Sequence, residues 1–319
     1  MECNTGKSLK PPADLRVGFY RSAKFFIFLA AAALAVKFFL FDTVVIKTGQ
    51  MSPALTAGDR VLLVRAPFIP VLNTVFTPAI GSPVVASHPT APGSYICLRV
   101  AGLAGDSVAI SKGMLTIANK PGVRLGFGLP DAEVLPLVYS PRDTMATYRI
   151  PACGDTLELD SLPLRDFFFA AALIKQENVK KNLRVRPLLV IDGKQNPGFS
   201  LSDFSLYKGA LDSIASRFDF DWFFWDRLRE YLARALKGKD FRLDFGLFDG
   251  SARMSEYCVK KSCIFLLADD WRKGFDSRYF GPVPLESVRG KPLCVLWSWA
   301  SGEEGKTGLR MERMIKLVR

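Results

Sequence analysis

A short segment directly after the most hydrophobic stretch of the chain carries the first residues that could do chemistry. It reads KTGQMSPALTAGDRVLLV, from Lys47 to Val64, and Thr48 and Ser52 supply hydroxyl groups. A hydroxyl acts as a nucleophile only when a neighbouring base takes its proton. The single histidine of the chain, His88, belongs to the residue type that most often does so. The segment therefore poses the question whether this chain is an enzyme or has only the framework of one.

Short runs rich in β-branched residues surround this segment. They read TVVIK, RVLLVR, PVVAS, YICLRVAG, SVAISKGMLTIANK and KPLCVLWSW, and Gly, Pro, Asn and Asp separate them. Such spacing predicts a mainly β, antiparallel architecture. The sequence SKGMLTIANKPG predicts a hairpin with Gly113 at its first turn. We expect residues 42–128 and 256–319 to form this β body.

The middle of the chain, residues 129–255, has helical character and is predicted to be a mixed α/β insertion on the β body. The expected helices cover residues 165–181 and 221–239, and in the second the apolar side chains share one face. An aromatic cluster, FDFDWFFW at 218–225, begins that helix. It either contacts the membrane interface or a partner or, in the favoured interpretation, packs the insertion against the body.

An N-terminal hydrophobic stretch predicts one transmembrane helix, a signal anchor over residues 24–41. The run from Phe25 to Val36 is uncharged, and Lys37 stands near one end, from where its amine can reach the interface. Lys and Arg residues precede it, so the positive-inside rule places residues 1–23 in the cytoplasm and the main domain on the extracytoplasmic side. A cleaved signal peptide is the alternative, but no A-x-A-like cleavage site follows the apolar run. A buried core helix is the remaining alternative.

The formal net charge is +12, yet the Lys and Arg residues are scattered rather than gathered in one run. No zinc-ligand spacing and no phosphate-binding glycine loop accompanies them, which argues against nucleic acid as a partner. A basic surface that faces anionic lipid accounts for the charge at least as well. The six cysteines match neither a zinc site nor a CxxC pair and are interpreted as buried hydrophobic side chains, with one or two disulfides as the alternative.

Six segments of the chain stand in a recognisable order. They read GQMSPALTAGDRVLLV, GSPVVASHP, ICLRVAGLAGDSVAI, GMLTIANKPG, RIPACGDTLEL and LLADDWRKGFDSRYFGPVPLESVRGKP. In sequence and spacing they resemble bacterial type I signal peptidase, a membrane-anchored family with a mostly antiparallel β fold. That family cuts signal peptides from exported proteins with a serine nucleophile and a neutral lysine as general base. The resemblance implies the same fold here and no metal or nucleotide cofactor.

The same resemblance implies that the catalytic residues are lost. The family's Gly-Ser-Met-x-Pro-Thr-Leu, with Ser as nucleophile, has Gln50 at the serine position. Its Lys-Arg-x-x-Gly-x-Pro-Gly-Asp has Leu98 at the general-base position. Its Gly-Asp-Asn-Arg-x-x-Ser-x-Asp-Ser-Arg begins here at Ala268, and Gly274 replaces the serine that supports the lysine. Neither a carboxamide nor an alkyl side chain can form the acyl-enzyme or carry its proton.

Other positions of the family framework remain. Thr48 stands where the family supplies an oxyanion-hole hydroxyl. The family holds its substrate extended between two strands, whose counterparts here are residues 42–47 and 95–98, and Ile46 and Cys97 would line pockets for small side chains. The retained charged residues are interpreted as a structural charge cluster under the cleft: Arg99, Asp276 and Arg278.

The leading hypothesis is a membrane-anchored, catalytically inactive signal peptidase homologue. It would bind exported or assembling polypeptides, or an active signal peptidase, and its body would contact membrane lipid. The alternative is a diverged but active signal peptidase that uses Ser52 or Thr48. Its nearest candidate bases are poor, because Arg99 does not deprotonate in proteins and His88 lies ten residues before the general-base position. A third hypothesis makes the insertion a scaffold and the cleft irrelevant.

Overall fold

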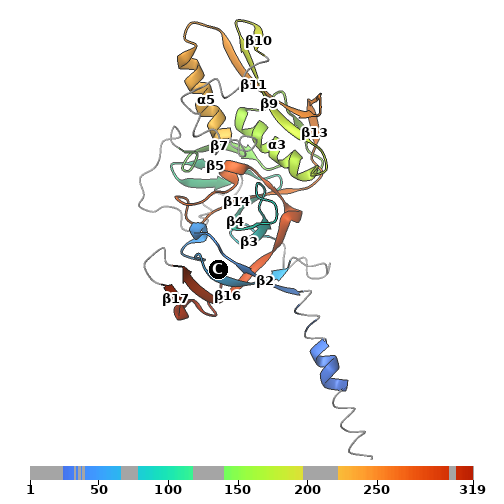
Figure 1. Ribbon diagram of the computed structural model, residues 1–319, viewed down its shortest axis with the longest axis vertical. Helices are drawn as coiled ribbons and strands as arrows, with labels where there is room; N and C mark the ends of the chain where they lie inside the picture. Colours follow the sequence, from blue (N-terminus) through green and yellow to red (C-terminus); the bar gives the residue numbers. More distant parts are fainter. Residues whose placement is uncertain are drawn as a thin grey trace, which may run out of the picture.

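The computed structural model of the protein (Figure 1) describes residues 24–31, 34, 37, 40–65, 78–117, 140–196, 222–301 and 307–318. The β-branched runs form the strands of its body, as the sequence predicts, because such side chains pack well on a pleated surface. Eight strands make one antiparallel sheet. In spatial order they are β1 (Phe41–Val45), β2 (Asp59–Arg65), β16 (Val288–Ser301), β3 (Pro83–Ser87), β4 (Tyr95–Leu103), β14 (Cys263–Leu267) and β15 (Val283–Pro284), while β17 (Thr307–Leu309) pairs with β16.

A hydrophobic cluster fills the inside of this sheet. Val61 and Leu63 of β2 are buried and alternate with more exposed neighbours, so this strand buries one face. Strand β4 is buried on both faces over most of its length and lies in the middle of the sheet. Met51 and Leu55, which follow β1, belong to the same cluster. Apolar packing therefore anchors the turn that contains Gln50.

Gly58 ends this turn and leads the chain into β2. Its φ is +90°, and a Cβ there would lie 1.8 Å from the carbonyl oxygen of Trp299 in β16, so only glycine fits. Its N–H donates to the carbonyl of Ile46 at 2.8 Å, and its own carbonyl accepts from the N–H of Trp299 at 3.0 Å. Both ends of the 46–58 loop are thus fixed beside β16.

Short helices complete the body: η1 (Gly49–Met51), α6 (Ser277–Phe280), η5 (Leu285–Ser287) and η6 (Met311–Arg313).

Two smaller sheets extend the body. One has the order β6 (Met114–Ile117), β5 (Ser107–Ser111) and β7 (Met145–Arg149), and the other pairs β13 (Glu256–Cys258) with β8 (Thr156–Glu158). The predicted hairpin is confirmed, because β5 and β6 pair across a turn at Lys112 and Gly113. Both turn residues have positive φ, 48° and 75°, as a two-residue hairpin turn requires. Residues 118–139, which include the second turn of that segment, lie outside the described part of the chain.

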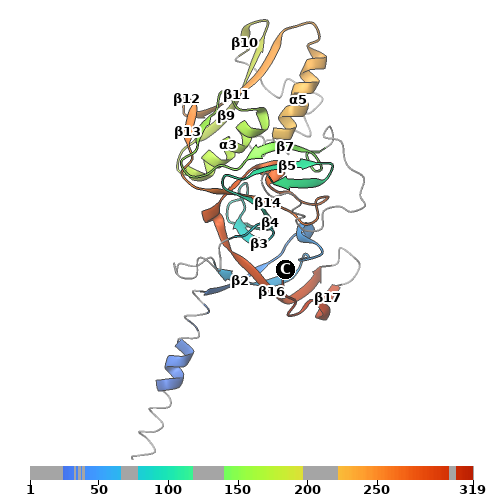
Figure 2. The ribbon, with the colours of Figure 1, turned by 180° about the vertical axis from the view of Figure 1, so that it is seen from behind.

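Within the predicted insertion, the elements between residues 164 and 254 form a further layer of strands and helices, whereas β7 and β8 belong to the sheets of the body. Its four-stranded antiparallel sheet has the order β10 (Lys194–Asn196), β9 (Leu183–Ile191), β11 (Phe241–Asp249) and β12 (Ala252–Met254). Helices α3 (Leu164–Glu177) and α5 (Trp222–Ala235) confirm the two expected helical segments. Figures 1 and 2 show this unit at the end of the molecule opposite the N-terminal segment.

The described part of the predicted aromatic cluster packs in the core. The ring of Trp225 lies 5.0 Å from that of Phe245 in β11 and 6.3 Å from that of Phe168 in α3. The indole N–H of Trp222 donates to the carbonyl of Arg278 at 3.0 Å. These contacts tie α5 to its own sheet and to the body, as the favoured interpretation expects. Residues 218–221 of the cluster lie outside the described residues.

The N-terminal segment is helical over residues 24–31, and its Phe and Leu side chains are exposed. In the part of the chain that the structure describes, no helix is both long enough and apolar enough to span a membrane. Six residues of the predicted anchor, 32, 33, 35, 36, 38 and 39, lie outside that part. Phe41, the last residue of the predicted anchor, is the first residue of β1.

Candidate functional site

The turn that contains Gln50 connects the body to the loop after β14. Gln50 lies in η1 with 8% of its surface exposed, and its carbonyl accepts from the N–H of Asp270 at 3.0 Å. Ile46, at the start of the turn, is buried, and its N–H donates to the carbonyl of Asp59 at 2.8 Å. Gln50 is therefore held by its backbone at the point where the two segments meet.

Strand β4 brings the second predicted position to the same region, since η1 packs against it. Leu98 is fully buried and pairs with Val84 of β3. β3 pairs with β4 over residues 95–99, whereas β14 joins the other edge of β4 only over residues 99–103. Residues 95–98 thus have β3 on one side, and their other edge lies beyond the β14 pairing.

Cys97 is buried beside Leu98, in surroundings that disfavour its thiol as a nucleophile. Burial raises the pKa of the Cys97 thiol to about 12, and the nearby Asp269 carboxylate adds to that effect. Because the thiolate is the reactive form of cysteine, this thiol stays protonated and inert at neutral pH.

Arg99 pairs with a carboxylate that the sequence analysis does not single out. Its Nε and Nη2 donate to the two oxygens of Asp269 at 2.8 and 2.7 Å, and its Nη1 donates to the carbonyl of Gly81 at 2.6 Å. Both side chains of the pair are buried. The bidentate geometry and the additional bond offset the desolvation of two charges. Asp269 was missed because the neighbouring Asp270 offers an identical residue type, and only the fold distinguishes them.

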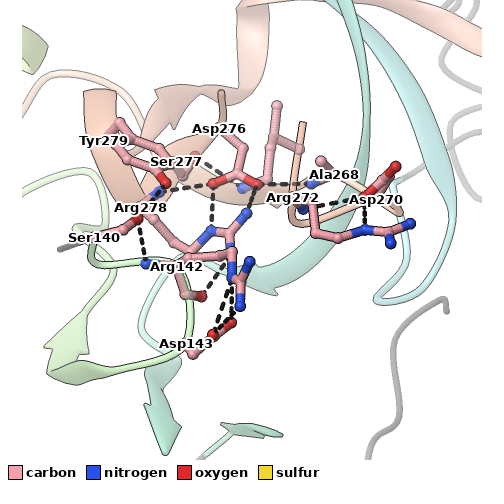
Figure 3. Close-up of polar contacts among 11 residues, drawn as sticks. Ser140, Arg142, Asp143, Ala268, Asp270, Arg272, Asp276, Ser277, Arg278 and Tyr279 are labelled. Atoms are coloured by element: carbon pink, nitrogen blue, oxygen red, sulfur yellow. Dashed lines mark hydrogen bonds and ion pairs between the residues drawn. The ribbon is translucent and has the colours of Figure 1, made fainter. Parts of the chain in front are cut away.

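Asp276 and Arg278 form a second buried ion pair (Figure 3). The guanidinium donates to both carboxylate oxygens, at 2.8 and 2.7 Å, and to the carbonyl of Arg142 at 2.6 Å. It also lies 4.6 Å from the centre of the Trp271 ring. Asp276 accepts from the N–H of Ala268 at 2.9 Å, which joins the two ends of the 268–276 loop. Of the predicted charge cluster, Asp276 and Arg278 form one bidentate pair, whereas Arg99 forms another with Asp269.

The third position, Gly274, contacts the first residue of its own motif. A Cβ on Gly274 would lie 2.3 Å from the Cβ of Ala268, which is far inside van der Waals contact. It would also lie 3.1 Å from the carbonyl oxygen of Asp270 and 3.3 Å from Oδ2 of Asp276. The resembled family has glycine at the position of Ala268 and serine at that of Gly274. The methyl group of Ala268 here occupies the volume that a side chain at 274 would need.

The remaining hydroxyls and the histidine do not form a nucleophile–base pair. Thr48 is exposed and Ser52 is half-buried, and among the described residues no hydrogen bond links either side chain to His88 or to a lysine. His88 is half-buried, and burial lowers its pKa. Its Nδ1 accepts from the backbone N–H of Thr90 at 3.2 Å. Its ring stacks 6.4 Å from that of Phe275, which follows Gly274, so the fold brings His88 to the loop of the third position although the sequence separates them.

The three predicted chemical positions meet in one uncharged region of the body. Gln50, Leu98 and Gly274 come from three segments that converge through the contacts of η1, β4 and the 268–276 loop. Two buried ion pairs hold that loop in place. A carboxamide and an alkyl group cannot supply an alkoxide or accept its proton.

Comparison with known proteins assigns the framework to a family. The family described as "Signal peptidase, peptidase S26" matches residues 19–125 and 226–297, more than half of the chain. Signal peptidase I of Buchnera aphidicola subsp. Schizaphis graminum is 22% identical over 292 residues, which cover 88% of this chain and 75% of that protein. Thylakoidal processing peptidase 1, chloroplastic, of Arabidopsis thaliana is 37% identical over 54 residues, which cover 17% of this chain and 16% of that protein.

Proposed function

The chain belongs to the signal peptidase family, peptidase S26, and from this premise we propose that it is a catalytically inactive member that binds polypeptides in the family's substrate cleft. The observation that carries the proposal is the state of the three chemical positions. Gln50, Leu98 and Gly274 lack every group that the Ser–Lys mechanism needs, while the surrounding framework is buried and hydrogen-bonded. A binding protein derived from an enzyme would lose the catalytic groups and retain the framework around them.

The strand edges support the binding role. β1 stands at one end of the sheet order, and residues 95–98 of β4 extend beyond the β14 pairing. An extended polypeptide can add to such edges through main-chain hydrogen bonds, which need no catalytic group. Ile46 and Cys97 then help to line pockets for small side chains of the bound polypeptide. The bound chain is an exported or assembling protein, or an active signal peptidase.

We place the protein on the cytoplasmic membrane, with its N-terminus in the cytoplasm and its body on the outer side. Exposed apolar side chains on β16, β17, η6 and the residues after η6 support this placement. They are Trp297, Trp299, Leu309, Met311 and Ile315. Arg60 lies 4.9 Å from the centre of the Trp297 ring. Trp and Arg together favour the lipid headgroup region. Figures 1 and 2 show these elements at the same end of the molecule as the N-terminal segment.

A single assay of binding and cleavage tests the proposed function. The full chain in detergent is mixed with a labelled signal peptide, and anisotropy and product formation are followed together. We expect binding without cleavage. The matched control is the same peptide with N-methyl groups on its backbone, which cannot pair with strand edges and should not bind.

Cleavage that Ser52→Ala or Thr48→Val abolishes would overturn the proposal in favour of a diverged, active peptidase. Equal binding of the methylated and unmethylated peptides would overturn the strand-pairing mode. Loss of all signal-peptide binding, with partners held only by the insertion, would favour a scaffold role instead.

A further inference from the structure

A cavity of about 600 Å³ opens between the insertion and the body, and Gln50, Leu98 and Gly274 are not among its lining residues. The turn between β3 and β4, with His88, Pro89 and Pro92, forms one wall. The end of α3 and the segment after it form the opposite wall, and Lys261, Pro284 and Glu286 close the space between them. This volume is in the range of ligand-binding sites in proteins.

The lining of the cavity is cationic. Lys175, Lys181 and Lys261 line it together with Glu286, the one carboxylate among its lining residues. Lys261 pairs with Glu286, and Lys181 pairs with Asp249 at 2.8 Å, but the side chains of both pairs are between 39% and 67% exposed. Exposed pairs of this kind contribute at most about 1 kcal/mol. The ammonium groups can therefore exchange these partners for a carboxylate of a ligand at little cost.

A hydrogen-bond network fixes the cationic walls relative to one another. Glu177, at the end of α3, accepts from the backbone N–H groups of Lys260 and Lys261 at 3.1 and 2.8 Å and from the hydroxyl of Tyr257 at 2.7 Å. Asn178 donates to the same hydroxyl at 2.9 Å and accepts from Nζ of Lys260 at 2.7 Å. The insertion and the β14 side of the body are thus held together, so the backbone of the cavity walls is preorganised for binding.

The remaining lining suits a polypeptide. Val179 and three prolines supply apolar surface, while Gln176 and Asn182 can hydrogen-bond a peptide backbone. The β3–β4 turn that forms one wall leads directly into Tyr95, the first residue of β4. A chain paired along residues 95–98 and continuing past Tyr95 reaches the cavity.

We propose that this cavity binds an acidic segment of an extended polypeptide. The occupant carries carboxylates that meet the three lysines and a backbone that meets the polar side chains of the walls. The inference deepens the proposed function and rests on it only in taking the occupant to be a polypeptide. The cavity then selects, among the chains held by the cleft, those with acidic residues at a fixed distance from the paired stretch.

Two peptides separate the cavity from the cleft. One is a labelled Glu-rich peptide without signal-peptide features, and its control has Gln in place of every Glu. Binding of each to the full chain is measured by anisotropy at about 0.15 M salt, where long-range attraction is screened. The second reporter is the signal peptide of the cleft assay, which carries no acidic residue.

The matched variants are Lys175→Gln, Lys261→Gln and Lys180→Gln. Lys180 is exposed on the same segment but does not line the cavity. We expect the Glu-rich peptide to bind more tightly than its Gln control, and each cavity variant to weaken it two- to fivefold, as for an exposed ion pair of about 0.5–1 kcal/mol. Lys180→Gln should leave it unchanged. Val179→Glu, at an 83% exposed position in the wall, should weaken it as well.

Equal losses from Lys180→Gln and Lys261→Gln would mean that net charge alone attracts the peptide, and would overturn the inference. Equal binding of the Glu and Gln peptides would overturn it as well. Anionic vesicles that bind only when the cavity lysines are intact would assign the cavity to lipid instead. If the signal peptide still binds in any of these cases, the proposed function stands. If the wild-type chain does not bind the signal peptide at all, the proposed function is overturned, and the peptide comparison still decides the inference about the cavity.

Discussion

A serine at position 274, where the resembled family has one, should destabilise the protein unless Ala268 is changed with it. A side chain at 274 brings its Cβ to 2.3 Å from the Cβ of Ala268, and both residues lie in a loop held by the Asp276 and Asp270 contacts. The backbone of Gly274 does not have positive φ, so the conflict is steric rather than conformational. Overpacking of this kind costs about 1–3 kcal/mol.

The double-mutant cycle of Gly274→Ser and Ala268→Gly measures this conflict directly. Ala268→Gly alone removes a buried methyl group and loosens the backbone, at about 1 kcal/mol. The double variant should be no less stable than Gly274→Ser, because the methyl that obstructs the serine is gone. We therefore expect a favourable coupling of about 1–3 kcal/mol in the free energy of unfolding, from urea titrations.

Gly49→Ser is the matched control, because a Cβ at Gly49 meets nothing within 4 Å. It should change stability by less than about 0.5 kcal/mol, as surface substitutions do. Additive effects of the two substitutions within about 0.5 kcal/mol would refute the reasoning, since additivity is the behaviour of residues that do not touch. It would mean that the loop relaxes and that Ala268 does not fill the place of the serine.

Three further predictions concern buried ionisable groups. Leu98→Lys places an amine at a fully buried position, which lowers the lysine pKa below about 10.4. The lysine should therefore destabilise the fold most at every pH below its lowered pKa, and the loss of thermal stability relative to Leu98→Met should shrink as the pH rises towards about 10. Burial alone raises the pKa of Asp59, but hydrogen bonds from Arg313 and its neighbours outweigh it and leave the pKa lowered. The ionised Asp59 therefore contributes its full stabilisation above about pH 4 and loses it as the pH falls further. In Asp59→Asn the free energy of unfolding should fall less steeply below about pH 4 than in the wild type, and an unchanged slope would contradict this. Burial and the hydrogen bond to Glu177 raise the pKa of Tyr257 to about 12. The protonated hydroxyl therefore stabilises the fold fully below about pH 10, and this stabilisation is lost as the pH rises from about 10 to about 12. Tyr257→Phe should remove this alkaline decrease in the free energy of unfolding, and a decrease that persists in the variant would contradict the role of the hydrogen-bond network.

The sequence alone identifies those features that depend on local order along the chain. The alternation of β-branched residues predicts the strands, and the Lys112–Gly113 turn predicts the β5–β6 hairpin, because turn geometry and side-chain period act over a few residues. The face of α5 follows from its helical period. The proposal that Gln50 and Leu98 replace the catalytic residues rests on equally local information, since each is one residue in a motif.

The tertiary structure alone decides which distant residues meet. Arg99 takes Asp269, 170 residues away, rather than the identical residue beside it, because the β4–β14 pairing sets which carboxylate reaches the guanidinium. The methyl group of Ala268 fills the space beside Gly274 because of the conformation of their loop, and no periodic pattern in the sequence predicts that conformation. The cationic cavity exists only because α3 packs beside the β3–β4 turn. Side-chain contacts of this kind are set by the packing of complete elements, and short-range preferences along the chain carry no information about them.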